Sequence, residues 1–166
     1  SRLELQTQDR GYKTDDALIV LRDSKGDEIK ILAQIKRSLT LIRSNDKFRQ
    51  TITDAWNDYN NRHLFNKDKY YCLLVTGPLS SKDTDAIGWL CNRARYCDVD
   101  DEFEDRLINS PGISDPHKEL YKTIKSFIND ASGAVVPVGE IKRFLARFLA
   151  LQPDCFYRKG LVESFA

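Results

Sequence analysis

The sequence lacks most of the patterns that would assign it to a specialised class of protein. Its 166 residues include no methionine, two histidines and four cysteines. The cysteines form no CxxC pair, so neither a zinc site nor a disulfide framework is indicated. No apolar run approaches the roughly 20 residues that cross a bilayer, and no secretory signal is present. We therefore expect a cytoplasmic protein without a membrane-spanning segment.

A strong charge of one sign is missing as well. The 26 basic and 25 acidic residues leave a formal net charge of +1, so any nucleic-acid surface would have to be a local patch. The segment TGPLSSKDT, residues 76–84, follows an apolar run and precedes a helical pattern, but it lacks the second glycine of a P-loop. A nucleotide-binding enzyme of that kind is therefore disfavoured.

What remains is the pattern of an ordinary α/β domain, with 41% hydrophobic and 31% charged residues. We expect strands over residues 2–6, 17–22, 29–36 and 70–77, with helices from residue 44, from residue 80 and over most of the chain beyond. The last of these helices is expected over residues 139–151. The expected division is a core over 1–97, a helical appendage of the same domain over 98–150, and a linker or tail over 151–166, and we suspect a piece of a longer protein.

The second and third strands carry the candidate chemistry. They flank the turn DSKGDE, residues 23–28, so a β-hairpin is expected. Asp15 and Asp16 begin its first strand, and Gln34 and Lys36 end its second. Because these two ends are adjacent in a tight hairpin, and because residues two apart share a face, we expect these side chains to converge at one edge of the sheet.

Such a cluster suits a hard cation such as Mg²⁺, which prefers carboxylate and carbonyl oxygens and keeps several waters. Asp16 would supply a carboxylate and Gln34 an amide oxygen, while Lys36 would stabilise charge on a metal-bound water and a phosphate. Gln34 is neutral, so a second carboxylate is needed. Glu4 could provide it if the first strand lies beside the hairpin.

The hairpin has a simpler interpretation too. Polar residues are common on a solvated strand face, and lysine often protects an edge strand from pairing with another chain. Taken without other features, Gln34 and Lys36 fit that interpretation better.

Asp16 followed by Gln34-Ile35-Lys36 across a hairpin resembles the PD-(D/E)xK nuclease superfamily in its QxK form. Residues 2 to about 96 are similar to its αβββαβ core, with the first helix apparently missing and one helix added. The segments GYKTDDALIVL, AQIKRS, YYCLLVTGPLSSKDTDAI and GEIKRFLARFLAL together resemble a narrower group. These are the double-stranded-DNA nuclease domains of bacterial anti-phage proteins, both cyclic-oligonucleotide-activated effectors and Avs-type STAND NTPases.

This resemblance implies a restriction-endonuclease-like mixed sheet with a C-terminal helical appendage, and a deoxyribonuclease that depends on Mg²⁺ or Mn²⁺. It implies Asp16, Gln34 and Lys36 as catalytic residues, with Asp15 and Glu4 as further metal ligands. It also implies a homo-oligomer in the full-length protein, driven by a C-terminal sensor or NTPase domain. Separately, Arg37, Arg43 and Lys47 form the best local basic cluster for a DNA backbone. The alternative is a catalytically inactive DNA-binding or oligomerisation module of the same fold.

Overall fold

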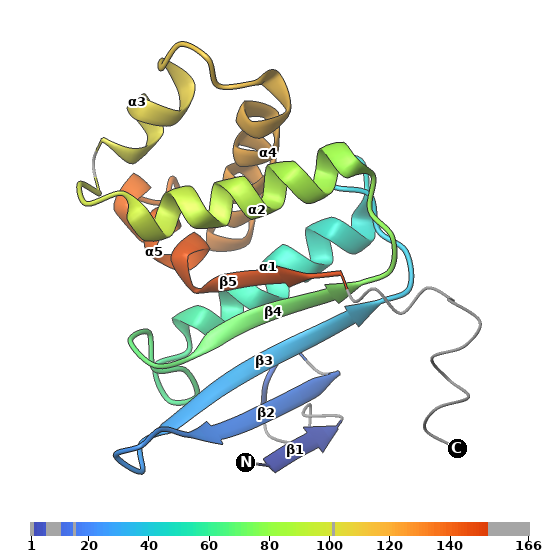
Figure 1. Ribbon diagram of the computed structural model, residues 1–166, viewed down its shortest axis with the longest axis vertical. Helices are drawn as coiled ribbons and strands as arrows, with labels where there is room; N and C mark the ends of the chain where they lie inside the picture. The colour runs from blue at the N-terminus through green and yellow to red at the C-terminus, as the bar shows by residue number, and fades with distance from the viewer. Residues whose placement is uncertain (1, 6–10, 15, 101, 153–166) are drawn as a thin grey trace.

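The computed structural model describes residues 2–5, 11–14, 16–100 and 102–152. Within them, one mixed sheet has its strands in the order β1-β2-β3-β4-β5 (Figure 1). The strands are β1 (Arg2–Leu5), β2 (Ala17–Arg22), β3 (Glu28–Lys36), β4 (Tyr71–Thr76) and β5 (Phe148–Leu151). The helices are α1 (Asp46–Asn60), α2 (Ser81–Tyr96), α3 (Phe103–Ile108), α4 (Asp115–Ser132) and α5 (Val138–Arg147). The expected mixed α/β architecture is confirmed at this level.

The expected hairpin of β2 and β3 is confirmed, with Ala17 opposite Ala33 in an antiparallel register. Its turn is closed by the Asp23 carboxylate, which accepts hydrogen bonds from the backbone amides of Lys25 and Asp27 at 2.9 Å each. Gly26 supplies the positive φ of 85° that a side chain would disfavour. Strand β1 pairs antiparallel with β2, whereas β3, β4 and β5 run parallel to one another.

The register divides the sheet into two faces. Leu18, Leu32 and Cys72 stand in one row across β2, β3 and β4, and all three are buried. Helix α1 covers this row, and its Ala55 carbonyl oxygen accepts a hydrogen bond from the Cys72 thiol. Phe48 and Ile52, on the apolar stripe predicted for this helix, are buried as well.

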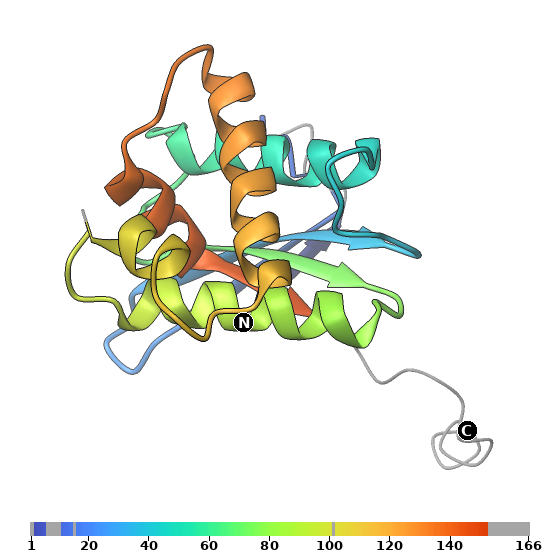
Figure 2. The same ribbon diagram turned by 90° about the horizontal axis from the view of Figure 1, so that it is seen from above.

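Figure 2 shows α1 and α2 on opposite sides of the sheet, with α4 crossing between them. Both α1 and α2 pack against α4, and the Trp56 indole of α1 donates to the Ser132 hydroxyl of α4 at 2.9 Å. Phe144 of α5 stands edge-on to the Trp56 ring, with centroids 5.4 Å apart. One hydrophobic core therefore continues from the sheet through these helices.

The expected helix over residues 139–151 is wrong at its end. Helix α5 stops at Arg147, and the next four residues form β5, which pairs parallel with β4. The physical reason is the open edge of β4, whose backbone groups need partners. Arg95 of α2 fixes the junction, because its guanidinium donates to the carbonyl oxygens of Ala146 at 3.2 Å and Phe148 at 2.7 Å.

Among the described helices, none combines the length and apolar character needed to cross a bilayer. Asp15 and residues 153–166 lie outside the described residues.

Candidate functional site

The end of β3, the residue before β2 and the middle of α1 meet in one place. The Asp16 carboxylate accepts a hydrogen bond from the backbone amide of Ile35 at 2.6 Å. The Lys36 ammonium lies 3.7 Å from the same Oδ2 atom of Asp16. The register places Gln34 beside them and Lys36 two residues further along the same face of β3. The structure thus brings together the three residues of the predicted motif.

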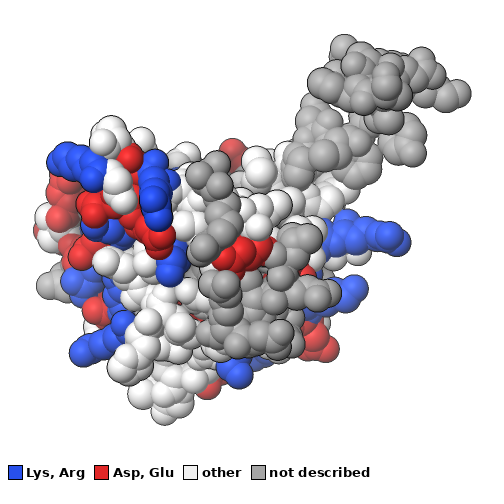
Figure 3. Space-filling view, turned by 90° about the horizontal axis from the view of Figure 1, so that it is seen from below, with Lys and Arg blue, Asp and Glu red and all other residues white. Residues whose placement is uncertain are grey.

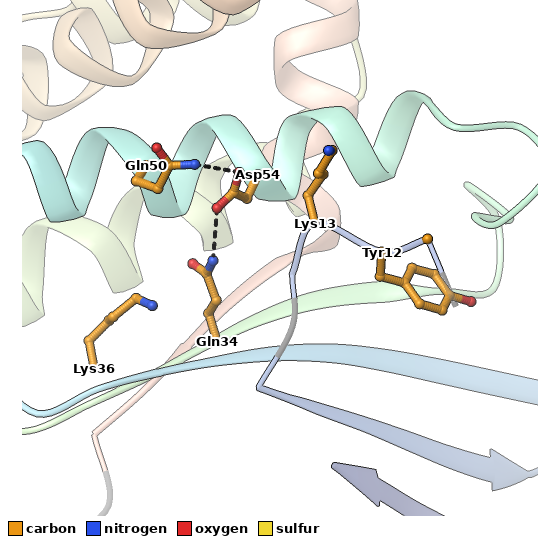
Figure 4. A pocket seen from close by; sticks show the side chains of 7 residues that line it. Tyr12, Lys13, Gln34, Lys36, Gln50 and Asp54 are labelled. Carbon is orange, nitrogen blue, oxygen red and sulfur yellow. Dashed lines mark hydrogen bonds between the residues drawn. The ribbon is translucent and has the colours of Figure 1, made fainter. Parts of the chain in front are cut away.

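Gln34 is a buried polar side chain with one half of its amide in use. Only 3% of the residue is exposed, and its Nε2 donates to Oδ2 of Asp54 at 3.2 Å (Figure 4). Because an ionised carboxylate can only accept, Asp54 fixes the amide with its nitrogen toward α1. The Oε1 atom has no hydrogen-bond partner among the described residues. The result is a buried, oriented oxygen that is free to bind a donor or a cation.

Asp54 is the acidic residue of the site that sequence reasoning missed. Its second oxygen accepts a hydrogen bond from Nε2 of Gln50, one turn earlier in α1, at 2.7 Å. The signal was present in the sequence, since Gln50, Asp54 and Asp58 recur every four residues along one side of an otherwise core-facing helix. A buried carboxylate repeated at that spacing needs partners from another element.

Gln34, Gln50 and Asp54 line a cavity of about 580 Å³. Figure 4 shows Lys36 and Lys13 on either side of the Gln34–Asp54 pair. The lining residues are Gly11, Tyr12, Lys13, Gln34, Lys36, Gln50 and Asp54. Two ammonium groups and one buried carboxylate make the cavity suited to an anion that arrives together with a metal ion.

Asp58 of α1 binds the backbone of the segment that carries Lys13, one of the cavity-lining residues. Its two carboxylate oxygens accept hydrogen bonds from the backbone amides of Lys13 at 2.7 Å and Thr14 at 2.6 Å. Burial raises the pKa of Asp58 above its ordinary value, although these two hydrogen bonds act in the opposite direction. The segment that leads into β2 is therefore anchored on α1.

Of the two further predicted metal ligands, only Glu4 lies among the described residues. Strand β1 lies beside the hairpin as expected, but Glu4 pairs with Leu18 and so stands two strands away from Gln34, in a different row. It is not among the described residues that line the cavity. Asp15 lies outside the described residues.

The predicted DNA-contacting cations follow β3 and lead into α1. Arg37 and Arg43 are exposed in the connection between the two elements, and Lys47 is exposed in the first turn of α1. Lys47 lines a shallow hollow with Ser38 and Thr40, and Arg43 lines another beside Lys82. Their role in DNA binding stays a prediction.

The described residues offer few ligands for a divalent cation. Among the described residues, no group of three or more His, Cys, Asp and Glu side chains is placed to hold a metal ion. Mg²⁺, however, is commonly held by one or two carboxylates and several waters. The cavity lining offers two oxygen donors of that kind, the unpartnered Gln34 oxygen and the Asp54 carboxylate. Asp16, like Glu4, is not among the described residues that line the cavity, although its carboxylate lies 3.7 Å from the Lys36 ammonium.

A second polar cluster joins α2 to the start of α4. The Ser114 hydroxyl contacts Nδ1 of His117, and the opposite ring nitrogen lies 3.1 Å from the Asp85 carboxylate. The order Ser–His–Asp suggests a nucleophile at first sight. Ser114, however, is the N-cap residue of α4, and its carbonyl oxygen accepts a hydrogen bond from the backbone amide of His117 at 3.1 Å, so the contact between the two side chains lies within the first turn of the helix. We assign this cluster a structural role.

Comparison with protein-family models, with curated proteins and with solved structures found no match for this chain.

Proposed function

We propose that this protein is a metal-dependent DNA endonuclease domain with a restriction-endonuclease-like fold. The observation that carries the proposal is the buried side-chain oxygen of Gln34. Asp54 orients the Gln34 amide, and its oxygen has no hydrogen-bond partner among the described residues. Lys36 and Asp16 lie beside Gln34 at the end of the hairpin. On a solvated strand face Gln34 would be exposed, whereas only 3% of this residue is exposed. Burying an amide oxygen without a partner is costly, which favours a ligand at that position.

Each residue has a distinct part in the proposed reaction. Asp16, Asp54 and Gln34 would hold Mg²⁺ or Mn²⁺, which supplies a water of lowered pKa and offsets charge on the phosphate. The backbone amide of Ile35 holds the Asp16 carboxylate in place. Lys36 would donate to the phosphate oxygen on which negative charge develops, since its ammonium extends from the end of β3 into the cavity.

The substrate class follows from charge and from the resemblance. Figure 3 shows basic and acidic side chains interspersed over the visible described surface, so a nucleic acid would have to be attracted by a local group of cations. Lys13 and Lys36 provide such a group in the lining of the cavity. The resemblance to nuclease domains of anti-phage proteins supports double-stranded DNA as substrate, and a role as the effector part of a larger, oligomeric bacterial defence protein.

The test is DNA cleavage by the purified protein. We expect duplex DNA to be cut with Mg²⁺ or Mn²⁺ and to remain intact with EDTA. Lys36→Ala and Asp16→Ala should each abolish cleavage without loss of the folded state, as judged by circular dichroism. Lys25→Ala, which removes the same charge at the exposed hairpin turn, is the matched control and should cleave normally. Unchanged metal-dependent cleavage by either site variant would contradict the assignment.

The absence of a three-ligand metal group among the described residues favours one alternative, a module that binds DNA or oligomerises without cutting it. DNA binding by the wild-type protein, with no cleavage in Mg²⁺ or Mn²⁺, would establish that alternative.

A further inference from the structure

The segment before β2 is fixed to α1 at two consecutive backbone positions. Asp58, which is 1% exposed, accepts hydrogen bonds from the amides of Lys13 and Thr14 through separate oxygens. Hydrogen bonds from backbone amides to a carboxylate are stronger than those between neutral groups. The position of the Lys13 backbone is therefore determined by α1, the helix that also carries Asp54.

The neighbours of Lys13 strengthen this attachment. Tyr12 is buried and its hydroxyl donates to the Leu64 carbonyl oxygen at 3.3 Å, while Thr14 on the other side is also buried. Lys13 lies between them and is exposed. Its side chain lines the same cavity as Gln34 and Lys36 (Figure 4). A rigid backbone thus holds a long cationic side chain at the wall of the candidate site.

The charge of Lys13 is available to a ligand. No ion pair of its ammonium group occurs among the described residues, whereas the Lys36 ammonium faces Asp16 at 3.7 Å. The Asp54 carboxylate of the cavity lining accepts hydrogen bonds from the side-chain amides of Gln34 and Gln50 rather than from either lysine. An anion entering the cavity would therefore meet two cations that extend from different elements.

We propose that Lys13 binds a backbone phosphate next to the scissile phosphate, and that Asp58 is the positioning residue that holds Lys13 there. This inference rests on the proposed function, because it assumes that DNA occupies the cavity. It assigns the segment before β2 a part in substrate binding, which the hairpin motif does not contain.

The first experiment measures DNA binding separately from cleavage. Binding of a fluorescent duplex is followed by anisotropy in EDTA at several salt concentrations, with wild type, Lys13→Ala, Lys13→Arg and the control Lys25→Ala. One phosphate contact contributes about 0.9 to the slope of log K against log salt, or about tenfold in affinity at about 0.1 M salt. We expect Lys13→Ala to bind the duplex about tenfold more weakly than wild type and to show a salt slope smaller by about 0.9. Lys13→Arg and Lys25→Ala should keep the wild-type affinity and salt slope.

The second experiment is a double-mutant cycle between Lys13→Ala and Asp58→Asn, which preserves the shape of the side chain and one acceptor oxygen. If Asp58 acts by placing Lys13, Asp58→Asn should lower both the affinity and the salt slope, and the double variant should bind like Lys13→Ala alone. A purely structural Asp58 would change thermal stability but not the salt slope. If Asp58→Asn does not fold, Asp58→Glu, which lengthens the side chain, takes its place.

The outcomes separate this inference from the proposed function. A Lys13→Ala protein with wild-type affinity and salt slope overturns the inference, even when Lys36→Ala has lost cleavage and the nuclease assignment stands. Additive effects of Lys13→Ala and Asp58→Asn on affinity overturn the positioning role alone. A wild-type protein that neither binds nor cuts duplex DNA overturns both.

Discussion

The two faces of the sheet differ in what they bury and in what they expose. Against α1, Leu18, Leu32 and Leu74 are fully enclosed, and the same face ends in Gln34 and Lys36. On the opposite face, α2 packs against β5 and Ala17 and Ala33 are buried, but the face is open at Leu3 and Ile35, which are 62% and 53% exposed. Both faces are apolar along most of their length, so composition alone does not separate them.

The difference shows how a polar site is placed at the border of a core. At the inner end of the covered face, α1 supplies a carboxylate to Gln34 instead of another apolar side chain. The buried amide is therefore satisfied on one side and free on the other. On the open face, water can satisfy a polar group at any position, so orientation of this kind cannot be maintained.

The largest expected effect comes from comparing substitutions at two neighbouring residues whose side chains lie on opposite faces of β3. Gln34→Ala should reduce metal-dependent DNA cleavage by at least about 100-fold, because the oriented oxygen is lost. Ile35→Ala, adjacent on the open face, should stay within about twofold of wild type, since a half-exposed side chain contributes little. Cleavage is measured on the same duplex, with circular dichroism as the control for folding. Similar losses in both variants would remove the distinction between the faces.

A smaller effect concerns stability. Leu32→Ala removes a fully enclosed side chain between β2 and β4 and should lower the free energy of unfolding by about 2–5 kcal/mol. Leu3→Ala, on the open face of β1, should change it by less than about 0.5 kcal/mol. Urea unfolding followed by tryptophan fluorescence measures both. A large loss in Leu3→Ala would indicate that the open face is covered in solution.

The smallest expected effect is a pH dependence from Asp58. Since burial raises its folded-state pKa, the folded protein binds this proton more tightly than the unfolded chain does. The resulting stabilisation is complete below the unfolded-state pKa and is lost as the pH rises through the folded-state value. The free energy of unfolding of wild type minus that of Asp58→Asn should therefore decrease as the pH rises above the ordinary aspartate pKa of about 4. A constant or rising difference would contradict this assignment.

Local patterns were sufficient for much of the fold. The Asp23 turn between two apolar runs predicted the hairpin, and the spacing of Phe48, Ile52 and Trp56 predicted α1. Strand β5 was not predictable in this way, because FLAL continues a helical pattern and its partner β4 is distant in sequence. Only the edge of β4 determines that these residues extend.

The residues of the candidate site also differ in how far the sequence could predict them. Asp16, Gln34 and Lys36 come together through a hairpin, whose register a sequence can indicate. Asp54 and Lys13 join them only because α1 crosses the end of β3 and because Asp58 holds the preceding segment. Such contacts depend on how a helix is placed over a sheet, which periodicity does not specify.

The hydrogen bonds that link Gln34 to Asp54 and Asp54 to Gln50 also make the site sensitive to the position of α1 relative to the sheet. Sliding α1 by one residue along its axis moves Asp54 by about 1.5 Å, enough to break a hydrogen bond that now measures 3.2 Å. The Gln34 amide would then be free to rotate and its oxygen would no longer be held toward the cavity. The alignment of the Gln34 oxygen therefore depends on the position of α1 relative to β3.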